Sequence, residues 1–299
     1  MSVEPADLST IASVPARARG GLLPAAWHAL KRAPPTAWFG LIVITIYLLI
    51  AVLAPLIAPY GEAEIVAGAY EPWGGDYLLG TDQLGRDLLS RLIYGARNTI
   101  GIAVMTTGLS FTIGGLLGLL AAILGGWTDQ LLARGVDILM AIPQLIFALM
   151  LLSIFGSSVT NLILIIAVLD STRVFRLTRA VAMNVVVLDF VEAARLQGER
   201  LGWIMTREVL PNILPPLVAE FGLRFCFVFL TIAALSFLGL GIQPPTPSFG
   251  SIIADSRKYL INAWWIATIP GIFLAVALTS INLMGSALEK ARNRIYGGL

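Results

Sequence analysis

Charge is scarce in this 299-residue chain, because only 13% of its residues are Asp, Glu, Lys or Arg, against about 25% in an ordinary soluble domain. Its 20 basic and 18 acidic residues nearly cancel, and a net charge of +2 gives no basic surface of the kind that nucleic acid requires. The chain has one cysteine, Cys226, and one histidine, His28. These counts exclude an intrachain disulfide, a zinc site built from His and Cys, and a histidine-based catalytic triad.

A nucleotide-binding motif is also missing, since no G-x-x-x-x-G-K-[ST] occurs. The glycines at Gly114, Gly115 and Gly118 lie in an apolar run without lysine, so they cannot cradle phosphates. Small residues four apart let two helices approach closely, and we expect a helix contact at these glycines. We therefore predict that the chain is not an enzyme and holds no metal or cofactor of its own.

Apolar residues dominate what is present: 57% of the chain is hydrophobic, and its mean hydropathy is +0.84. A spanning helix needs about 20 apolar residues. We predict an all-α polytopic membrane protein with six transmembrane helices, over residues 37–58, 98–124, 131–155, 159–179, 213–241 and 264–287.

Most lysines and arginines fall on one side of the membrane if the N-terminus is cytoplasmic, which favours an N-in/C-in orientation. The first apolar run has no signal-peptide cleavage pattern before it and is interpreted as a retained anchor. We thus predict a cytoplasmic tail over 1–36, a periplasmic segment over 59–97, a membrane domain over 98–287 with a cytoplasmic loop over 180–212, and a cytoplasmic tail over 288–299.

The cytoplasmic loop has the pattern of two short helices separated by a glycine. Residues 192–197 favour a helix, and Gly198 should end it at a cap or tight bend. A second short helix is predicted over Leu201–Val209, and Leu210, Pro211 and Asn212 should stop it. The pair of small residues Ala193 and Ala194 would let another protein surface come close.

This loop resembles the signature loop of ABC importer permeases, E-A-A-x3-G-x9-I-x-L-P. The matching positions are Glu192, Ala193, Ala194, Gly198, Leu210 and Pro211, while Glu208 departs from the usual Ile or His. In that family the loop forms a coupling helix that docks in a groove of a cytoplasmic ATPase. The resemblance implies the same role for these six residues; the alternative is an amphipathic connector without a partner.

Three further stretches resemble the dipeptide/oligopeptide/nickel type of these permeases, and specifically its C-type subunit. They are the GTD-x-LGRD segment over 80–92, the LSFLGLG-x-QPPTP segment over 235–247, and the WW-x-x-x-PG start of the last run at 264–271, together with Asp137 and Pro143. The resemblance covers roughly residues 35–287. It implies the type I ABC importer permease fold and the inner membrane of a bacterium.

The same resemblance implies the partners. They are a homologous second permease subunit, two ABC ATPase subunits that carry ATP and Mg, an external solute-binding protein, the lipid bilayer and a small solute. A peptide is expected as the solute, with a nickel chelate, an opine or an oligosaccharide as alternatives. A different class of function, an autonomous secondary transporter or channel, would need carboxylates within the spans, for which Glu220 and Asp170 are the candidates.

Charged residues outside the loop allow two interpretations each. Glu220 and Arg224 are four apart on one helix face and form either an ion pair or a lining of the substrate path, to which Ser236 is also assigned. Two residue sets remain. The first set is Asp82, Arg86 and Asp87. We expect these residues to form exposed pairs, worth less than about 1 kcal/mol, that cap the outer face; the alternative is that they seat the binding protein. The second set is a stripe along one helix, and its arginines are expected to reach lipid headgroups rather than the ATPase: Asp170, Arg173, Arg176 and Arg179.

Overall fold

The computed structural model describes residues 35–257 and 264–296, and apart from three isolated β-bridges every regular element in these ranges is a helix. The predicted tail 1–36 lies almost wholly outside them. In chain order the elements are α2 (Pro35–Ile57), α3 (Leu88–Leu124), α4 (Gly126–Met140), α5 (Gln144–Phe155), α6 (Val159–Val186), α7 (Asp189–Leu196), α8 (Leu201–Trp203), the π-helix η2 (Ile204–Val209), α9 (Leu210–Phe237), α10 (Phe249–Ser256) and α11 (Trp264–Tyr296). The all-α prediction is confirmed.

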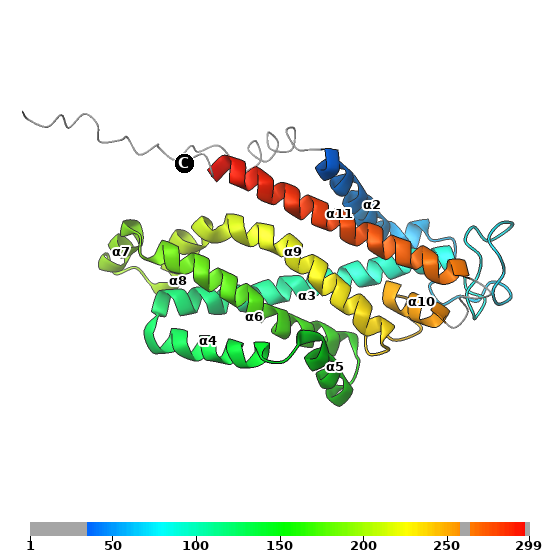
Figure 1. Cartoon of the computed structure of the whole chain (residues 1–299), viewed down its shortest axis with the longest axis horizontal. Helices are drawn as coiled ribbons and strands as arrows, with labels where there is room; N and C mark the ends of the chain where they lie inside the picture. Colours follow the sequence, from blue (N-terminus) through cyan, green and yellow to red (C-terminus); the bar gives the residue numbers. More distant parts are fainter. Residues whose placement is uncertain (1–34, 258–263, 297–299) are drawn as a thin grey trace, which may run out of the picture.

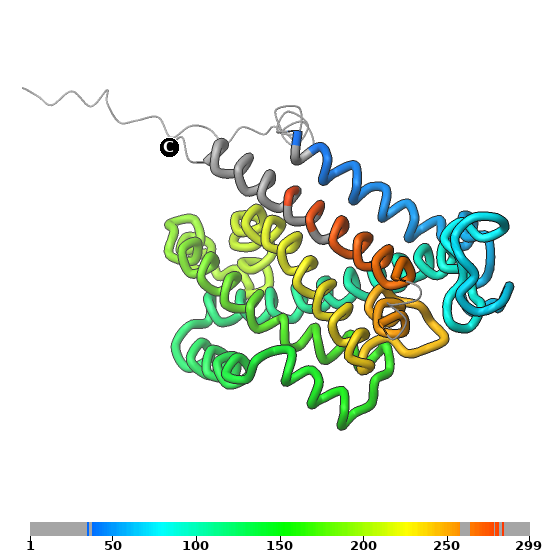
Figure 2. The backbone as a smooth tube through the Cα atoms, turned by 45° about the vertical axis from the view of Figure 1, so that its right-hand side comes forward, coloured from blue at the N-terminus to red at the C-terminus, as the bar shows by residue number. Residues whose placement is uncertain are grey.

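Three long helices, α3, α6 and α9, form the centre of the bundle (Figures 1 and 2). Helices α2 and α11 lie side by side along one flank, and α4 and α5 lie along the other. The segment between α2 and α3 and the short helix α7 occupy opposite ends of the longest axis. This arrangement separates the two motifs that the sequence singles out.

The predicted contact at the glycines of α3 is confirmed. A Cβ atom on Gly114 would collide with the carbonyl oxygen of Ser171, and one on Gly118 would press against Thr178, both on α6. Gly115, on the other side of α3, faces open space. Small residues spaced by one turn therefore allow the close packing of α3 on α6, which is the most extensive helix contact in the bundle.

The lengths of the helices agree only partly with six continuous spans. Among the described residues, three helices are long and apolar enough to cross a membrane, namely Trp38–Ile57, Leu88–Leu124 and Leu201–Phe237. The expected span 131–155 is instead two helices, α4 and α5, which meet at an angle of 84°. Pro143 directly precedes α5, where its missing amide donor ends one helix and allows another to begin. Six spans and their orientation stay a prediction.

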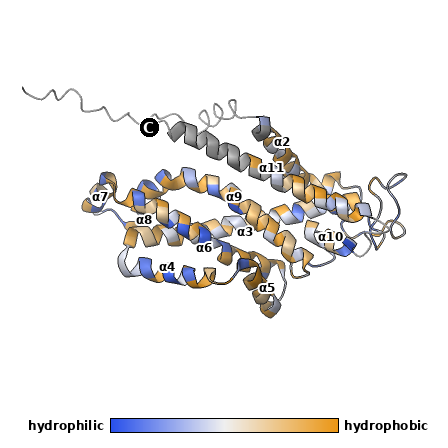
Figure 3. Ribbon diagram, in the orientation of Figure 1, coloured by the Kyte–Doolittle hydropathy of each residue, from blue (hydrophilic) through white to orange (hydrophobic). Residues whose placement is uncertain are grey.

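The remaining boundaries also differ from the expected ones. Helix α3 begins at Leu88, ten residues before the expected span, because Asp87 caps it. Helix α6 continues to Val186 and carries charged residues among its apolar ones, visible as blue bands in Figure 3. Helix α11 continues to Tyr296, through most of the expected C-terminal tail.

The prediction that Leu210, Pro211 and Asn212 stop a helix is wrong. Residues 201–237 form one continuous helical run, because η2 leads directly into α9. The amide of Leu210 bonds to the carbonyl of Met205 in the wider π-helical pattern, and Pro211 falls in the first turn of α9, where an amide donor is dispensable. The segment that follows α7 therefore passes into the core helix α9 without a break in the helix.

Candidate functional site

Helix α7 ends where the glycine spacing predicts. Gly198 has φ of +79° and its amide donates to the carbonyl of Arg195, while the amide of Glu199 donates to that of Ala194. These two bonds form a Schellman motif, which needs a left-handed residue at this position. The chain therefore reverses here and returns as α8 and η2.

One face of α7 is anchored in the bundle. Val191 and Ala194 are buried in a cluster with Leu119 and Ile123 of α3 and with the apolar residues of η2. The Arg195 side chain donates to the carbonyl of Ile123, 3.1 Å away, in the last turn of α3, where the helix dipole favours a cation. The sequence analysis assigned no role to Arg195, although a basic residue in the last turn of a short helix could have indicated a contact with a backbone carbonyl.

The opposite face of α7 points away from the bundle. Glu192 and Ala193 are exposed, and Leu196 is 83% exposed. Large apolar side chains continue this surface, which we call the inner face patch: Val187, Leu188, Phe190, Leu196, Leu201 and Trp203. Exposed apolar groups gathered at one end of a helical bundle are typical of a protein interaction surface.

The six residues predicted to couple to an ATPase divide between these two faces. Glu192, Ala193, Gly198 and Pro211 are exposed, whereas Ala194 is buried and Leu210 packs on the apolar cluster. The structure thus gives the first group access to a partner and the second group a role in attaching the surface to α3, α6 and α9.

The charges of α9 join a network that crosses three helices. Arg224 donates from Nε to Glu220, 2.7 Å away, and its Nη1 atom lies 3.7 Å from Asp170 of α6. Asp170 in turn accepts a bond of 2.9 Å from the hydroxyl of Ser110 on α3. Arg224 and Asp170 are both buried. The expected Glu220–Arg224 pair is present, and Arg224 extends it into the helix interface.

Ser236 lies apart from this network at the far end of α9. It is buried, and its hydroxyl accepts the amide of Ile242, 3.1 Å away. A Cβ atom on Gly241 or Gly250 would collide with Ser236 or its neighbours. Ser236 therefore holds the turn that follows α9, and the structure does not bring it together with Glu220 and Arg224.

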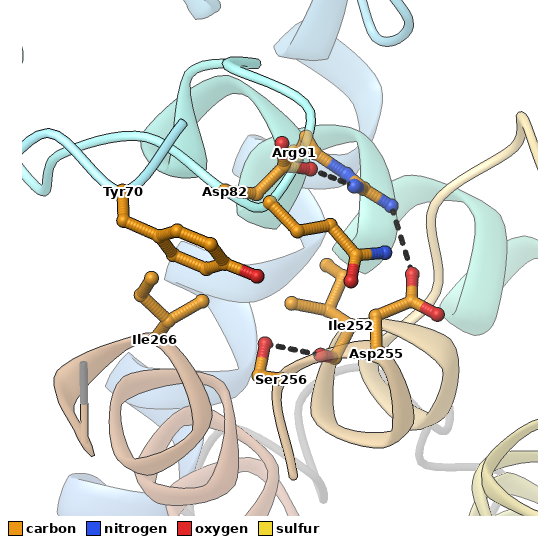
Figure 4. A pocket seen from close by; sticks show the side chains of 8 residues that line it. Tyr70, Asp82, Arg91, Ile252, Asp255, Ser256 and Ile266 are labelled. Atoms are coloured by element: carbon orange, nitrogen blue, oxygen red, sulfur yellow. Dashed lines mark hydrogen bonds and ion pairs between the residues drawn. The ribbon is translucent and has the colours of Figure 1, made fainter. Parts of the chain in front are cut away.

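The motif over 80–92 forms a buried ion cluster, of which Figure 4 shows Asp82 and Arg91 together with Asp255. Asp82 accepts the Arg86 guanidinium at 2.8 Å, pairs with Arg91 of α3, and accepts the amides of Leu84 and Arg86. Arg91 also lies 3.9 Å from Asp255 of α10. The side chains of Asp82, Arg86 and Arg91 are only 4–6% exposed. The expectation that these pairs are exposed is therefore wrong, whereas the expected pairing of Asp82 with Arg86 and the capping of a helix end by Asp87 are confirmed.

The local backbone explains this burial. Gly80 and Gly85 have positive φ, and a Cβ atom on either would collide with the carbonyl oxygen of Glu71 or Ala67. The tight loop wraps Asp82 in amides, while Asp87 caps α3 by accepting the amide of Ser90 at 2.8 Å. Burial raises the pKa of Asp82, but Arg91, the amides of Arg86 and Leu84, and the Arg86 guanidinium outweigh it and hold this pKa below its usual value.

The arginine stripe of α6 binds α4. Arg176 lies 2.6 Å from Asp137, and Arg179 pairs with Asp129. Both arginines thus have carboxylate partners on α4 that the sequence analysis did not assign, and their contact with lipid headgroups stays a prediction.

Comparisons with known proteins agree with this architecture. Residues 114–294 match the family described as the binding-protein-dependent transport system inner membrane component. Residues 22–72 match the N-terminal transmembrane domain of oligopeptide transport permease C. The chain is 40% identical over 259 residues to the di/tripeptide transport system permease protein DppC of Pseudomonas aeruginosa, covering 84% of this chain and 86% of that protein.

A second relative, the dipeptide transport system permease protein DppC of Escherichia coli K12, is 40% identical over 272 residues, covering 89% of this chain and 90% of that protein. Among solved structures, an inward-facing methionine ABC transporter, MetNI, matches with a TM-score of 0.55 and 18% identity over 68% of this chain and 97% of that chain. That likeness shows a shared fold. The chain therefore belongs to the family of binding-protein-dependent transport system inner membrane components, as an ABC importer permease of the oligopeptide permease C type.

Proposed function

We propose that this chain is a permease subunit of an ATP-driven peptide importer in the inner membrane of a bacterium. The names of its relatives support a di- or tripeptide as the solute. With a homologous second permease the chain would enclose the translocation path. Two ABC ATPase subunits, which carry ATP and Mg, would bind at the end that holds α7, and a solute-binding protein would dock at the other end.

One observation carries the proposal: α7 has an exposed surface on one side and is packed against the helical bundle on the other. The solvent-exposed side of α7 displays Glu192 and Ala193 beside the inner face patch. The opposite side is fixed to α3 through Val191 and Arg195. A force applied to this helix cannot be absorbed locally, because the cluster beneath it is close-packed. Movement of an ATPase would thus shift α3, α6 and α9 together.

The charge network fits this role better than that of an ion carrier. Asp170 and Glu220, the carboxylates that an autonomous secondary transporter would use, are both engaged by Arg224. We propose that the network of Ser110, Asp170, Glu220 and Arg224 holds three helices in register during transport, and that Ser236 stabilises the turn after α9 rather than touching the solute.

Cysteine cross-linking tests the interface directly, using the neighbours Ala193, exposed, and Ala194, buried. In the assembled transporter, Ala193→Cys should cross-link to the ATPase subunit with a bifunctional thiol reagent, whereas Ala194→Cys should not. The native Cys226 is buried and provides an internal background control. Cross-linking from both positions or from neither would contradict the proposed interface.

A functional test uses Gly198→Pro. Proline cannot adopt the positive φ of Gly198 and cannot donate the bond to Arg195. The variant should insert and assemble but lose dipeptide uptake into proteoliposomes that contain the complete complex. Unchanged uptake and unchanged substrate-stimulated ATP hydrolysis would refute a coupling role for α7.

A further inference from the structure

Three arginines of α6 follow one another at intervals of three residues, and the two nearer α7 are neutralised by α4. Arg179 pairs with Asp129, and Arg176 lies 2.6 Å from Asp137. The next arginine of the series, Arg173, is exposed and makes no ion pair or hydrogen bond within residues 35–257 and 264–296. Where a third carboxylate would stand, α4 has already ended at Met140.

A pocket of about 110 Å³ occupies this position. It lies at the break between α4 and α5 and is lined by Met140, Pro143, Gln144, Thr172 and Arg173, among others. The Thr172 hydroxyl already donates to the carbonyl of Leu169, so the donors left for a ligand are the Arg173 guanidinium and the Gln144 amide. The first turn of α5 has no side-chain cap, and its free amides add positive potential on the same side.

The level of Arg173 in the bundle makes an unpaired charge there significant. Its neighbours Ser171 and Phe175 touch Gly114 and Gly118 of α3, a helix that is apolar and long enough to cross a membrane. A guanidinium facing lipid tails at such a level is costly, so charged groups in spans face water, an anion or a partner. Asp170, one turn earlier on α6, acts on Arg173 electrostatically but is already bonded to Ser110 and paired with Arg224. The exposed guanidinium of Arg173 is therefore left to meet water or an anion.

We propose that this pocket is a subsite for the carboxylate of the transported solute, with Arg173 as its cation and Gln144 as a second donor. A planar guanidinium binds a carboxylate with two parallel hydrogen bonds, which suits the terminal carboxylate of a peptide. Helix α4 supplies one wall of the pocket and is held against α6 by the ion pair of Arg179 with Asp129. This subsite rests on the proposed function, because it needs a solute that passes through the permease.

ATP-driven uptake by the complete reconstituted transporter tests the subsite with two probes, dialanine and alanyl-alaninamide, which differ in the terminal carboxylate. Arg173→Gln should lower dialanine uptake about tenfold or more and change alanyl-alaninamide uptake less than about twofold. Arg173→Lys, which keeps the charge, should retain dialanine uptake within about threefold. Arg176→Gln is the matched control, since Arg176 already has a partner, and it should leave the ratio of the two probes unchanged.

Other outcomes would overturn the inference. An equal loss of uptake for both probes would indicate that Arg173 has a structural role, contacts the second permease or binds a lipid phosphate. If the loss depends on the amount of anionic lipid, the lipid phosphate is the partner. Equal uptake by the wild type and Arg173→Gln would show that no subsite exists. A wild-type complex that imports neither probe would refute the proposed peptide import, and the subsite with it. Failure of the proposed function is therefore distinguishable from failure of the subsite alone.

Discussion

The two ends of the molecule use their charge and glycine patterns in opposite ways. At the end predicted to lie outside, which we call the outer end, Asp82, Arg86 and Arg91 point into the structure and pair with one another. At the end predicted to lie inside, which we call the inner end, Glu192 and Ala193 are exposed, and the residues beneath them form the attachment. A motif whose side chains bond internally stabilises its own segment, whereas one whose side chains remain exposed is available to a partner.

The largest expected effect comes from breaking the outer ion cluster. Asp82→Asn should destabilise the protein by about 3–5 kcal/mol, because it removes the charge that pairs with two buried arginines. Thermal unfolding in detergent measures the loss. Asp76→Asn changes the same residue type at an exposed position of the same segment and should cost less than about 0.5 kcal/mol. Equal costs for both would show that burial of the cluster is unimportant.

Alanine at the positive-φ glycines of the two ends sharpens the comparison. Gly85→Ala should cost about 3 kcal/mol, since its Cβ would collide with the backbone of Ala67 in addition to the strain of a left-handed residue. Gly198→Ala carries only the strain, about 1–2 kcal/mol, because open space surrounds that position. Unfolding free energies of the two variants should differ in this order; the reverse order would place the tighter packing at the inner end.

A smaller effect, on binding rather than folding, is expected at the inner face patch. Leu196→Ser removes an exposed apolar side chain and should weaken association with the ATPase subunit by about 1–2 kcal/mol while leaving the unfolding temperature unchanged. Val191→Ser, on the buried side of the same helix, should instead lower the unfolding temperature. Binding can be measured with the detergent-solubilised subunits. A Leu196→Ser variant that unfolds early but binds normally would contradict the assignment.

The smallest effect is a dependence of the outer end on pH. The folded-state pKa of Asp82 lies below the ordinary value of 3.8, so its carboxylate stabilises the loop above that value and loses this contribution as the pH falls through the folded pKa. Hydrogen exchange at the amides of Leu84 and Arg86 should be constant between about pH 7 and pH 5 and accelerate only below about pH 4, after correction for intrinsic rates. In Asp82→Asn this acid transition should be absent.

Several features of the fold follow from local sequence alone. Long apolar runs predict α2 and most of α3 and α9, and small residues one turn apart predict the contact at Gly114 and Gly118. Gly198 after a helix-favouring stretch predicts the end of α7. In each case the determining interaction lies within a few residues of the chain, or depends only on the absence of a side chain.

Two of the features that the sequence analysis missed involve partners far along the chain. The charges of the GTD-x-LGRD pattern suggest exposure; the tight loop buries Asp82 locally, and Asp255 of α10 adds a distant charge near Arg91. The arginines of α6 suggest lipid contact until α4 folds back with Asp129 and Asp137. The prolines of α9 suggest a helix end, but a π-helical turn absorbs Pro211.

The continuous run from Leu201 to Phe237 is 37 residues long, or about 55 Å at 1.5 Å per residue. The run starts beside α7, and Ser236 holds the turn that follows it. Beyond that turn, the carbonyl of Pro247 accepts a bond from Asn98 of α3, and the amide of Phe249 donates to Thr99 of α3. Pro215 and Pro216 lie inside this run, so it can bend there, but its backbone stays helical from end to end. A displacement of the segment beside α7 can therefore be passed along one unbroken helix to the turn after α9 without a separate connecting element.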